Sequence, residues 1–403
     1  MNLPFRTGVN LREFAYYGTA SVPYTRSELQ AAQLTELSGL GVQLIRLYGA
    51  CQRLSLDDNV RRLKAALDTI HRAGMQAIIA LNDSFNSEWI VPGESPYHNA
   101  TSSHLHKNYW LNRVYQKTYL PYIRTVATAL AGHPALLLWE LGNEYALHPQ
   151  PANPADERAF YNFAAEASAV LKQITPLTLV STGLINTNQV TVPATRVAAA
   201  RRLYSLPSID AISIHFYRED GEIDYAGLDI QIGRELGKPF YVGEMGAMIT
   251  RLPDRSAYYA SEFQRWRSAG AFTIMPWAFD TSPWNVGVSD LYAFARIHRD
   301  YNGLKAVVQS NATHAPAYRP VPTGTRRFQV ILSPLSVRME ASLSAKRLDL
   351  LAGGACIDVD AKSRTEVGGY VWWRHYGKQQ WSAEKRLLDN VVYMQEVAAV
   401  RLG

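Results

Sequence analysis

Two glutamates stand in short motifs that end apolar runs of the sequence. Glu144 belongs to WELGNEY and Glu244 belongs to YVGEMG. Two carboxylates on either side of one substrate bond are the arrangement that glycoside hydrolysis requires, and they act there as acid, base or nucleophile. A separation of about 5–5.5 Å would imply retention of the anomeric configuration, and about 6.5–9.5 Å would imply inversion. The sequence leaves both outcomes open.

Other polar and aromatic side chains close further apolar runs in the same way. They are Arg46 and Tyr48 in IRLYG, Asn82 and Asp83 in LNDSF, Asn143 in WELGNEY, His215 and Tyr217 in ISIHFY, and Trp277 in MPWAFD. One such run end would say little. Several run ends with polar or aromatic residues predict one shared site, provided that the fold places these run ends next to one another.

Eight short β-like runs supply that fold. They span 7–11, 43–48, 76–82, 136–141, 177–181, 211–216, 239–243 and 272–277, and segments with helical periodicity lie between them. This alternation predicts an α/β fold, a (β/α)8 TIM barrel. Functional groups collect at the C-terminal ends of the strands in such a barrel. The fourth and seventh strands, which carry Glu144 and Glu244, face each other across it.

The texture of the sequence changes after the predicted barrel, which we assign to residues 1–310. Residues 311–326 are rich in Pro, Ala and Thr and have no hydrophobic period, so they predict a linker. Short alternating strands in residues 327–403, separated by the turns Gly353-Gly354 and Gly368-Gly369, predict a small all-β barrel.

The composition is typical of folded domains and argues against a membrane span and a nucleic-acid partner. Apolar residues make up 47% and charged residues 19% of the 403 residues, which excludes a disordered chain. No apolar run is long enough to span a membrane, and the first residues lack the apolar core of a signal peptide. Cys51 and Cys356 lie far apart and predict free thiols. The net charge of +6 forms no basic stripe, so a nucleic-acid partner is not expected.

Taken together, WELGNE, HFY, the GE of YVGEMG and the Trp of MPWAFD resemble the clan A glycoside hydrolases, and most closely the cellulase-like family 5. The match keeps the family's order along the predicted barrel. The resemblance implies that Glu144 is the general acid/base and Glu244 the nucleophile of a retaining mechanism. It also implies positions for five further residues: Asn143 on the substrate 2-hydroxyl, Arg46 and Tyr217 beside the nucleophile, Trp277 under the sugar ring, and His215 in the hydrogen-bond network near Glu144.

The chain departs from the family pattern at two places. The family usually has a histidine after the third strand, where this chain has Asn82 and Asp83, and often a proline after the acid/base, where it has Tyr145. These residues would border the subsites next to the cleaved bond, and we expect Asn82 to contact the substrate. The departures bear on the identity of the substrate more than on the reaction. Asp83 also fits a turn residue.

Charge and burial predict complementary roles for the two glutamates. Arg46 and Tyr217 would keep Glu244 ionised through charge and hydrogen bonding. Glu144, which lies near a second carboxylate and is partly desolvated, is expected to have a raised pKa and to donate a proton. Glu140 lies deeper in the strand, and we expect it to pair with Arg46 or water.

Tryptophans in the predicted loops are candidates for holding neighbouring sugars. An indole face suits the apolar C–H face of a pyranose. Trp89, Trp110 and Trp284 are therefore candidate sugar platforms, and packing is the alternative for each.

The last part of the chain resembles the bacterial SH3-like modules. The stretches that carry the resemblance are LSVRMEASLSAKRLDLLAGGACIDVD and VWWRHYGKQQW. The resemblance implies binding to a cell-wall glycan or peptide, or simple packing on the barrel. Of Trp372 and Trp373, at least one side chain is expected to contribute to the core of the small barrel.

We therefore expect a retaining β-glycosidase, endo-acting on a β-1,4-linked glucan or mannan, that uses no metal and no organic cofactor. It is expected to be a monomer with a β-glycan substrate, without a nucleic-acid partner or a membrane span. A secreted or cell-surface location follows from the substrate class, with a cytoplasmic location as the alternative. Three alternatives for function remain: an exo-acting or transglycosylating enzyme, an inactive glycan-binding or cell-wall-binding protein, and an SH3-like domain that recognises peptidoglycan as the main functional unit.

Overall fold

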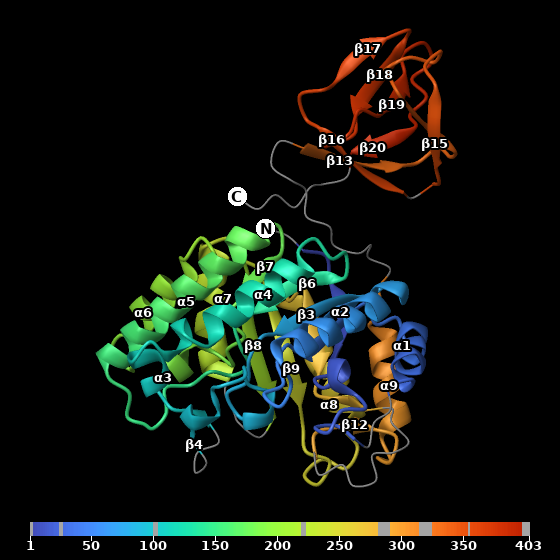
Figure 1. The fold of residues 1–403 in the computed structure, drawn as a ribbon. Helices are drawn as coiled ribbons and strands as arrows, with labels where there is room; N and C mark the ends of the chain where they lie inside the picture. Colours follow the sequence, from blue (N-terminus) through green and yellow to red (C-terminus); the bar gives the residue numbers. More distant parts are fainter. Residues whose placement is uncertain are drawn as a thin grey trace. The chain divides into compact units, whose positions relative to one another are not determined.

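The computed structural model describes residues 3–23, 27–99, 104–218, 223–280, 291–313, 325–353 and 355–396. The chain divides into two compact units, Asn2–Tyr318 and Arg319–Gly403. Most of the predicted linker, residues 314–324, lies outside the described residues. Figure 1 shows the two units.

Eight parallel strands form the barrel of the larger unit, in the order β7-β6-β3-β2-β1-β10-β9-β8. Their bounds are β1 Arg6–Asn10, β2 Leu44–Tyr48, β3 Gln76–Ala80, β6 Leu136–Glu140, β7 Leu179–Ser181, β8 Ile212–Tyr217, β9 Phe240–Gly246 and β10 Thr273–Pro276. An isolated bridge between Ser181 and Ala211 joins β7 to β8, so that the barrel is nearly closed. Each strand overlaps one of the predicted runs, and the TIM-barrel prediction is confirmed.

A helix follows each barrel strand, and the helices lie around the strands in Figure 1. Their bounds are α1 Leu29–Gly39, α2 Leu56–Arg72, α4 Tyr119–Leu130, α5 Pro154–Ile174, α6 Arg196–Tyr204, α7 Ile223–Glu235, α8 Ser256–Ser268 and α9 Tyr301–Ser310. The start of α5 shows why the sequence begins a helix there. Asn153 accepts hydrogen bonds from the backbone N–H groups of Ala155 and Asp156, and the Asp156 carboxylate accepts one from the Asn153 N–H, which together form a capping box. Pro154 then fits the first helical position, where its missing N–H costs nothing.

Short elements build the loops of the barrel unit. They are η1 Phe14–Tyr16, η2 Ser87–Trp89, η3 Ser95–Tyr97, α3 Asn108–Leu111, η4 Val114–Gln116 and η5 Thr187–Val190, with the strand pairs β4 His98–Asn99 and β5 His104–Leu105, and β11 Phe279–Asp280 and β12 Phe294–Ala295. No described helix is both long and apolar enough to cross a bilayer.

One glycine lets the end of β7 approach the segment that follows β6. Gly183 has φ +70°, and a Cβ added to it would lie 1.9 Å from the carbonyl oxygen of Gly142. The close approach allows the Glu144 N–H to donate to the Gly183 carbonyl oxygen at 2.9 Å. Glycine is therefore required at 183, and the contact fixes the backbone of Glu144.

The smaller unit is all-β, as predicted. A five-stranded sheet has the order β15-β14-β19-β18-β17 and a three-stranded sheet the order β16-β13-β20, with every pair antiparallel. The bounds are β13 Thr325–Val330, β14 Leu335–Arg338, β15 Arg347–Leu351, β16 Cys356–Asp360, β17 Thr365–Val367, β18 Tyr370–Arg374, β19 Trp381–Arg386 and β20 Met394–Glu396. Trp373 packs in a core of its own with Phe328, Val330 and Met394. The likeness to SH3 modules stays a prediction.

Candidate active site

The structure brings Glu144 and Glu244 together inside the barrel. Glu144 follows the end of β6, Glu244 lies in β9, and both side chains are buried. One oxygen of each carboxylate and one ring nitrogen of His215 all lie within 4.8 Å of one another. This separation is shorter than inversion needs and suits a direct attack by one of the two carboxylates.

The backbone of Glu144 is left-handed, with φ 53°. Residues with a Cβ seldom adopt this conformation, and the exceptions concentrate at functional sites. The contact with Gly183 described above holds the backbone there. The strained turn directs the carboxylate toward His215, whose Nδ1 lies 2.6 Å from Glu144 Oε1.

Arg46 in β2 connects the buried polar groups of the site. Its Nη1 donates to Glu244 Oε1 at 2.7 Å and its Nη2 to Asn143 Oδ1 at 2.7 Å. Its Nε lies 3.0 and 2.9 Å from the two carboxylate oxygens of Glu140. The guanidinium is planar and carries five N–H donors, so one side chain can orient several acceptors at once.

Tyr217 and His215, both in β8, lie on the other side of Glu244. The Tyr217 hydroxyl donates to Glu244 Oε2 at 2.6 Å. His215 Nδ1 lies 3.7 Å from the same oxygen, closer to Glu144 than to Glu244. Glu244 therefore has Arg46 at one oxygen and Tyr217 at the other, which fixes the plane of its carboxylate.

Asn143 links Arg46 to the segment that follows β3. Its Nδ2 donates to the Tyr48 hydroxyl at 3.1 Å and to Asp83 Oδ1 at 2.9 Å, while its Oδ1 accepts from Arg46. Asp83 also accepts from the backbone N–H groups of Phe85 and Asn86, as expected of a turn residue. Asp83 thus turns the chain and holds Asn143 in place.

Trp277 directly follows β10 and is 8% exposed. The guanidinium carbon of Arg12 lies 5.5 Å from the centroid of its ring. Arg12 also pairs with Glu13 at 2.9 Å and is 34% exposed. The indole face predicted to lie under the sugar is therefore close to a cation that sequence reasoning did not consider.

Two of the predicted substrate contacts do not join this cluster, and a third lies outside the described residues. Asn82 is fully buried, and its amide is used within the protein: Nδ2 donates to Glu94 at 2.8 Å and Oδ1 accepts from the Val91 N–H at 2.9 Å. Trp89 is 3% exposed and packs against the rings of Tyr16 and Tyr48. Its indole therefore contacts Tyr48 and has no exposed face on which a sugar could stack. Trp284 lies outside the described residues.

Two further positions turn inward as well. Trp110 is fully buried among Tyr145, Phe160 and Phe163. Tyr145 packs in the same aromatic group and donates its hydroxyl to the Leu141 carbonyl oxygen at 3.2 Å. The expectation that Tyr145 borders the cleaved bond is therefore wrong, because its ring points into the core.

Asn10 is a site residue that the sequence analysis missed. It is buried at the end of β1, accepts from Arg46 Nη1 at 3.0 Å, and donates to the carbonyl oxygens of Gly243 and Met275 at 2.9 and 3.1 Å. It thereby holds β9 and β10 beside β1. The signal was present, since Asn10 is the polar residue at the end of the first strand, and Arg46 and Asn143 are polar residues within or just after the second and fourth predicted strands.

Burial changes the protonation of the site. It raises the pKa of Glu244 to about 7, and although His215, Arg46 and Tyr217 lower it, the Glu144 carboxylate raises it further. Burial also lowers the pKa of His215 to about 4, so that the imidazole is neutral at pH 7. The expected effect of Arg46 and Tyr217 on Glu244 has the right sign, but desolvation outweighs it.

Glu144, His215 and Glu244 are also close enough to act as metal ligands. Arg46, however, already places a buried positive charge 2.7 Å from Glu244 Oε1. A divalent cation on Glu244 would be repelled by this guanidinium and would have to displace it from three other acceptors. The donor set fits a carboxylate pair held by arginine better than a metal centre.

No family model matches the chain. A stretch of 125 residues is 30% identical to a curated protein of Emericella nidulans, the probable mannan endo-1,4-beta-mannosidase F. The stretch covers 31% of this chain and 27% of that protein, so the chain spans about a quarter of the length of the curated relative.

Solved structures share the barrel fold at low sequence identity. The endo-1,4-beta-D-mannanase of Thermotoga petrophila has a TM-score of 0.59 and 17% identity, over 76% of this chain and 99% of that chain. A family 5 mannosidase of Rhizomucor miehei has a TM-score of 0.56 and 16% identity, over 77% and 94%. An exo-beta-1,4-mannosidase of an Opitutaceae bacterium has a TM-score of 0.56 and 18% identity, over 80% and 61%. The barrel of this chain therefore has the fold of the family 5 glycoside hydrolases.

Proposed function

We propose that this protein is a retaining β-glycoside hydrolase that cleaves β-1,4-linked mannan. The observation that carries the proposal is the approach of the Glu144 and Glu244 carboxylates, with oxygens within 4.8 Å of each other. That spacing supports retention over inversion, because inverting enzymes hold their two carboxyl groups about 6.5–9.5 Å apart to admit a water molecule. The similarity to proteins named as mannanases supports mannan as the substrate class.

The proposed reaction has two steps. In the first step Glu244 attacks the anomeric carbon while Glu144 donates a proton to the leaving oxygen, so that a carboxylate–sugar bond forms and the glycosidic bond breaks. In the second step Glu144, now ionised, takes a proton from water, and the resulting hydroxide displaces Glu244 from the sugar. Arg46 and Tyr217 orient the attacking carboxylate. Asn143 is proposed to bind the 2-hydroxyl, and Trp277 to lie under the sugar ring.

We expect kcat/KM to fall as the pH is lowered through about 7, because Glu244 must be ionised to attack and burial raises the pKa of its carboxyl to about 7. The measurement is kcat/KM on a soluble manno-oligosaccharide from pH 4 to pH 9. Tyr217→Phe removes a hydrogen-bond donor to Glu244, and its acidic limb should therefore lie at higher pH than that of the wild type. An acidic limb near pH 4.5 in both proteins would contradict the effect of burial.

A polysaccharide panel tests the substrate. Release of reducing sugar from mannan, glucomannan, carboxymethylcellulose, mixed-linkage glucan, xylan and peptidoglycan is measured with and without EDTA, and Glu244→Gln serves as the background control. We expect release from mannan or glucomannan that EDTA leaves unchanged. Oligosaccharide products would indicate endo action and mannose alone exo action, and NMR of the first product should show the β-anomer. Binding to mannan without release would instead favour the inactive glycan-binding protein.

The smaller unit and the location of the protein are separate proposals. The SH3-like resemblance favours a role in binding a cell-wall glycan or peptide, and a monomer that is secreted or attached to the cell surface fits a polymeric substrate. Deletion of the smaller unit should weaken binding to cell walls and leave hydrolysis of soluble oligosaccharides unchanged if this proposal is right.

A further inference from the structure

A third buried carboxylate, that of Glu140 at the end of β6, also contacts the Arg46 guanidinium. Glu140 lies at Nε and Nη2, whereas Glu244 lies at Nη1. Besides the two contacts of Arg46 Nε, Arg46 Nη2 lies 2.7 Å from Glu140 Oε2. The Tyr241 hydroxyl donates to Glu140 Oε1 at 2.6 Å. Glu140 is fully buried and does not touch the Glu144–His215 pair in any described contact, so it is placed to act on Arg46 and not on a substrate.

The proposed reaction changes the charge next to Arg46. In the first step the Glu244 carboxylate becomes an ester and loses its negative charge, while Arg46 keeps its positive one. A buried cation without an ionised partner is strongly unfavourable. Because Arg46 is 1% exposed, water cannot replace the lost partner. A second anion must remain beside Arg46 if the guanidinium is to stay in place until the ester is hydrolysed.

We propose that Glu140 is the permanent counter-ion of Arg46 and, through Arg46, a positioning residue for Glu244 in both steps of the reaction. The inference rests on the proposed function for its mechanistic part. Glu140 and Glu244 share one cation, so the negative charge of Glu140 opposes ionisation of Glu244 while Arg46 favours it. Other titratable or charged groups around this cluster are Tyr48 in β2, Asp83 after β3, Glu144 after β6, His215 and Tyr217 in β8, Tyr241 in β9, and Arg12 near Tyr48.

The first test is Glu140→Gln, which removes the charge and keeps the shape. With one negative charge fewer, Glu244 should ionise more readily, and the acidic limb of kcat/KM should move down by about half a pH unit or more. We expect kcat to fall about tenfold or more, with KM within about threefold, because the geometry of the reacting carboxylate changes and uniform binding does not. Lost packing alone would not shift the limb to lower pH.

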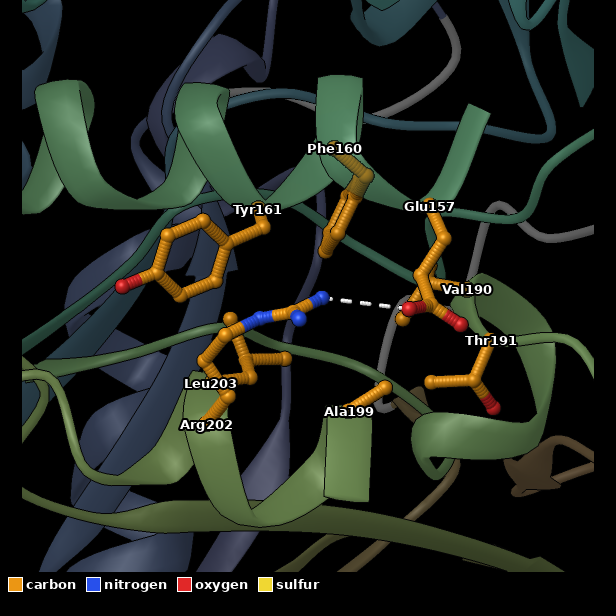
Figure 2. Close-up of a pocket in the computed structure, with 8 residues that line it drawn as sticks. All are labelled: Glu157, Phe160, Tyr161, Val190, Thr191, Ala199, Arg202 and Leu203. Atoms are coloured by element: carbon orange, nitrogen blue, oxygen red, sulfur yellow. Dashed lines mark hydrogen bonds and ion pairs between the residues drawn. The ribbon is translucent and has the colours of Figure 1, made fainter. Parts of the chain in front are cut away.

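Glu157→Gln is the matched control. Glu157 in α5 is a buried glutamate that pairs with Arg202 at 3.1 Å, beside the ring of Tyr161 (Figure 2). The cavity next to this pair has a volume of about 10 Å³, and none of the residues that line it belongs to the candidate active site. Glu157→Gln also removes a buried carboxylate from the larger unit. The pH profile and kcat should nevertheless stay as in the wild type.

Glu140→Asp covers the case in which Glu140→Gln does not fold, as judged by circular dichroism. The aspartate keeps the charge but is one methylene shorter, so the acidic limb should stay within about 0.3 pH units while kcat falls severalfold. Wild-type kcat in Glu140→Asp, or an unshifted limb in a folded Glu140→Gln, would overturn the proposal.

A measurement without substrate separates this proposal from the proposed function. The ¹³C resonance of the Glu244 carboxyl, assigned with Glu244→Gln, is titrated in the wild type and in Glu140→Gln. A midpoint that moves down in Glu140→Gln supports the coupling of Glu140 to Glu244 through Arg46, even if no glycan is cleaved. If no glycan is cleaved, only the role of Glu140 in the reaction is overturned. An unmoved midpoint in a protein that cleaves mannan overturns the role of Glu140 and leaves the proposed function standing.

Discussion

Replacement of Glu244 by Gln is expected to lower kcat on the cleaved glycan by about 10⁴-fold or more, which corresponds to about 5.5 kcal/mol of transition-state stabilisation. The amide cannot form the covalent intermediate, and it is a poor acceptor for the donors Arg46 and Tyr217 that already face it. Glu144→Gln should lower kcat/KM by a smaller factor on activated aryl glycosides than on mannan, because a good leaving group needs no proton in the first step. Rates are measured on mannan and on a dinitrophenyl mannoside.

Azide distinguishes the roles of the two glutamates. In Glu144→Ala, azide can enter from the side that the leaving group vacates and should give a mannosyl azide with retained configuration. In Glu244→Ala, azide takes the place of the missing nucleophile and should give the inverted product. Exchange of these two outcomes would mean that the assignment of acid/base and nucleophile is reversed, and wild-type rates in either variant would contradict the two-carboxylate mechanism.

Arg46→Met is expected to lower the free energy of unfolding by about 3–5 kcal/mol and to abolish measurable hydrolysis. The substitution leaves the buried carboxylates of Glu140 and Glu244 without their shared cation, and Asn10 and Asn143 each lose a donor. Arg46→Lys should be only partly better, because a single ammonium cannot reach all the acceptors that the guanidinium bridges. Urea unfolding and kcat on mannan are the measurements.

Arg202→Lys provides the comparison for Arg46. Arg202 pairs with Glu157, but its side chain is 46% exposed. A half-exposed ion pair contributes little, so we expect a change within about 1 kcal/mol and no change in kcat. A loss of stability in Arg46→Met that is no larger than in Arg202→Lys would argue against Arg46 as the organiser of the site.

The sequence predicted the barrel, and it predicted that Glu144 and Glu244 lie close together, because both depend on patterns with a fixed period. The alternation of strands and helices shows which strands have their C-terminal parts at the same level of the barrel. Arg46, His215 and Glu244 lie in the C-terminal halves or middles of such strands, and Glu144 follows one. The same rule, applied to the first strand, would have added Asn10. Glu140, which lies deeper in its strand than Glu144, was expected to pair with Arg46 or water, and the structure pairs it with Arg46.

The loop residues could not be placed in the same way. Asn82 and Trp89 face the protein interior because the chain after β3 folds back over them, and the buried carboxylate of Glu94 accepts hydrogen bonds from Asn82 and Thr118. No local sequence pattern predicts the hydrogen bond between Asn82 and Glu94, which are twelve positions apart in the chain. The pKa of Glu244 was also out of reach, because its largest cause is burial, which the sequence expresses only through the folded barrel.

The left-handed backbone conformation of Glu144 affects which sequences a laboratory selection for stability would favour. A left-handed glutamate and a neighbouring carboxylate of like charge are both unfavourable, so the barrel tolerates the site at the expense of its own stability. Glycine or asparagine at position 144 would relax the backbone and remove one of the opposing charges. A library selected for heat resistance alone should therefore accumulate inactive sequences at this codon, and only a selection that also demands sugar release would keep the glutamate.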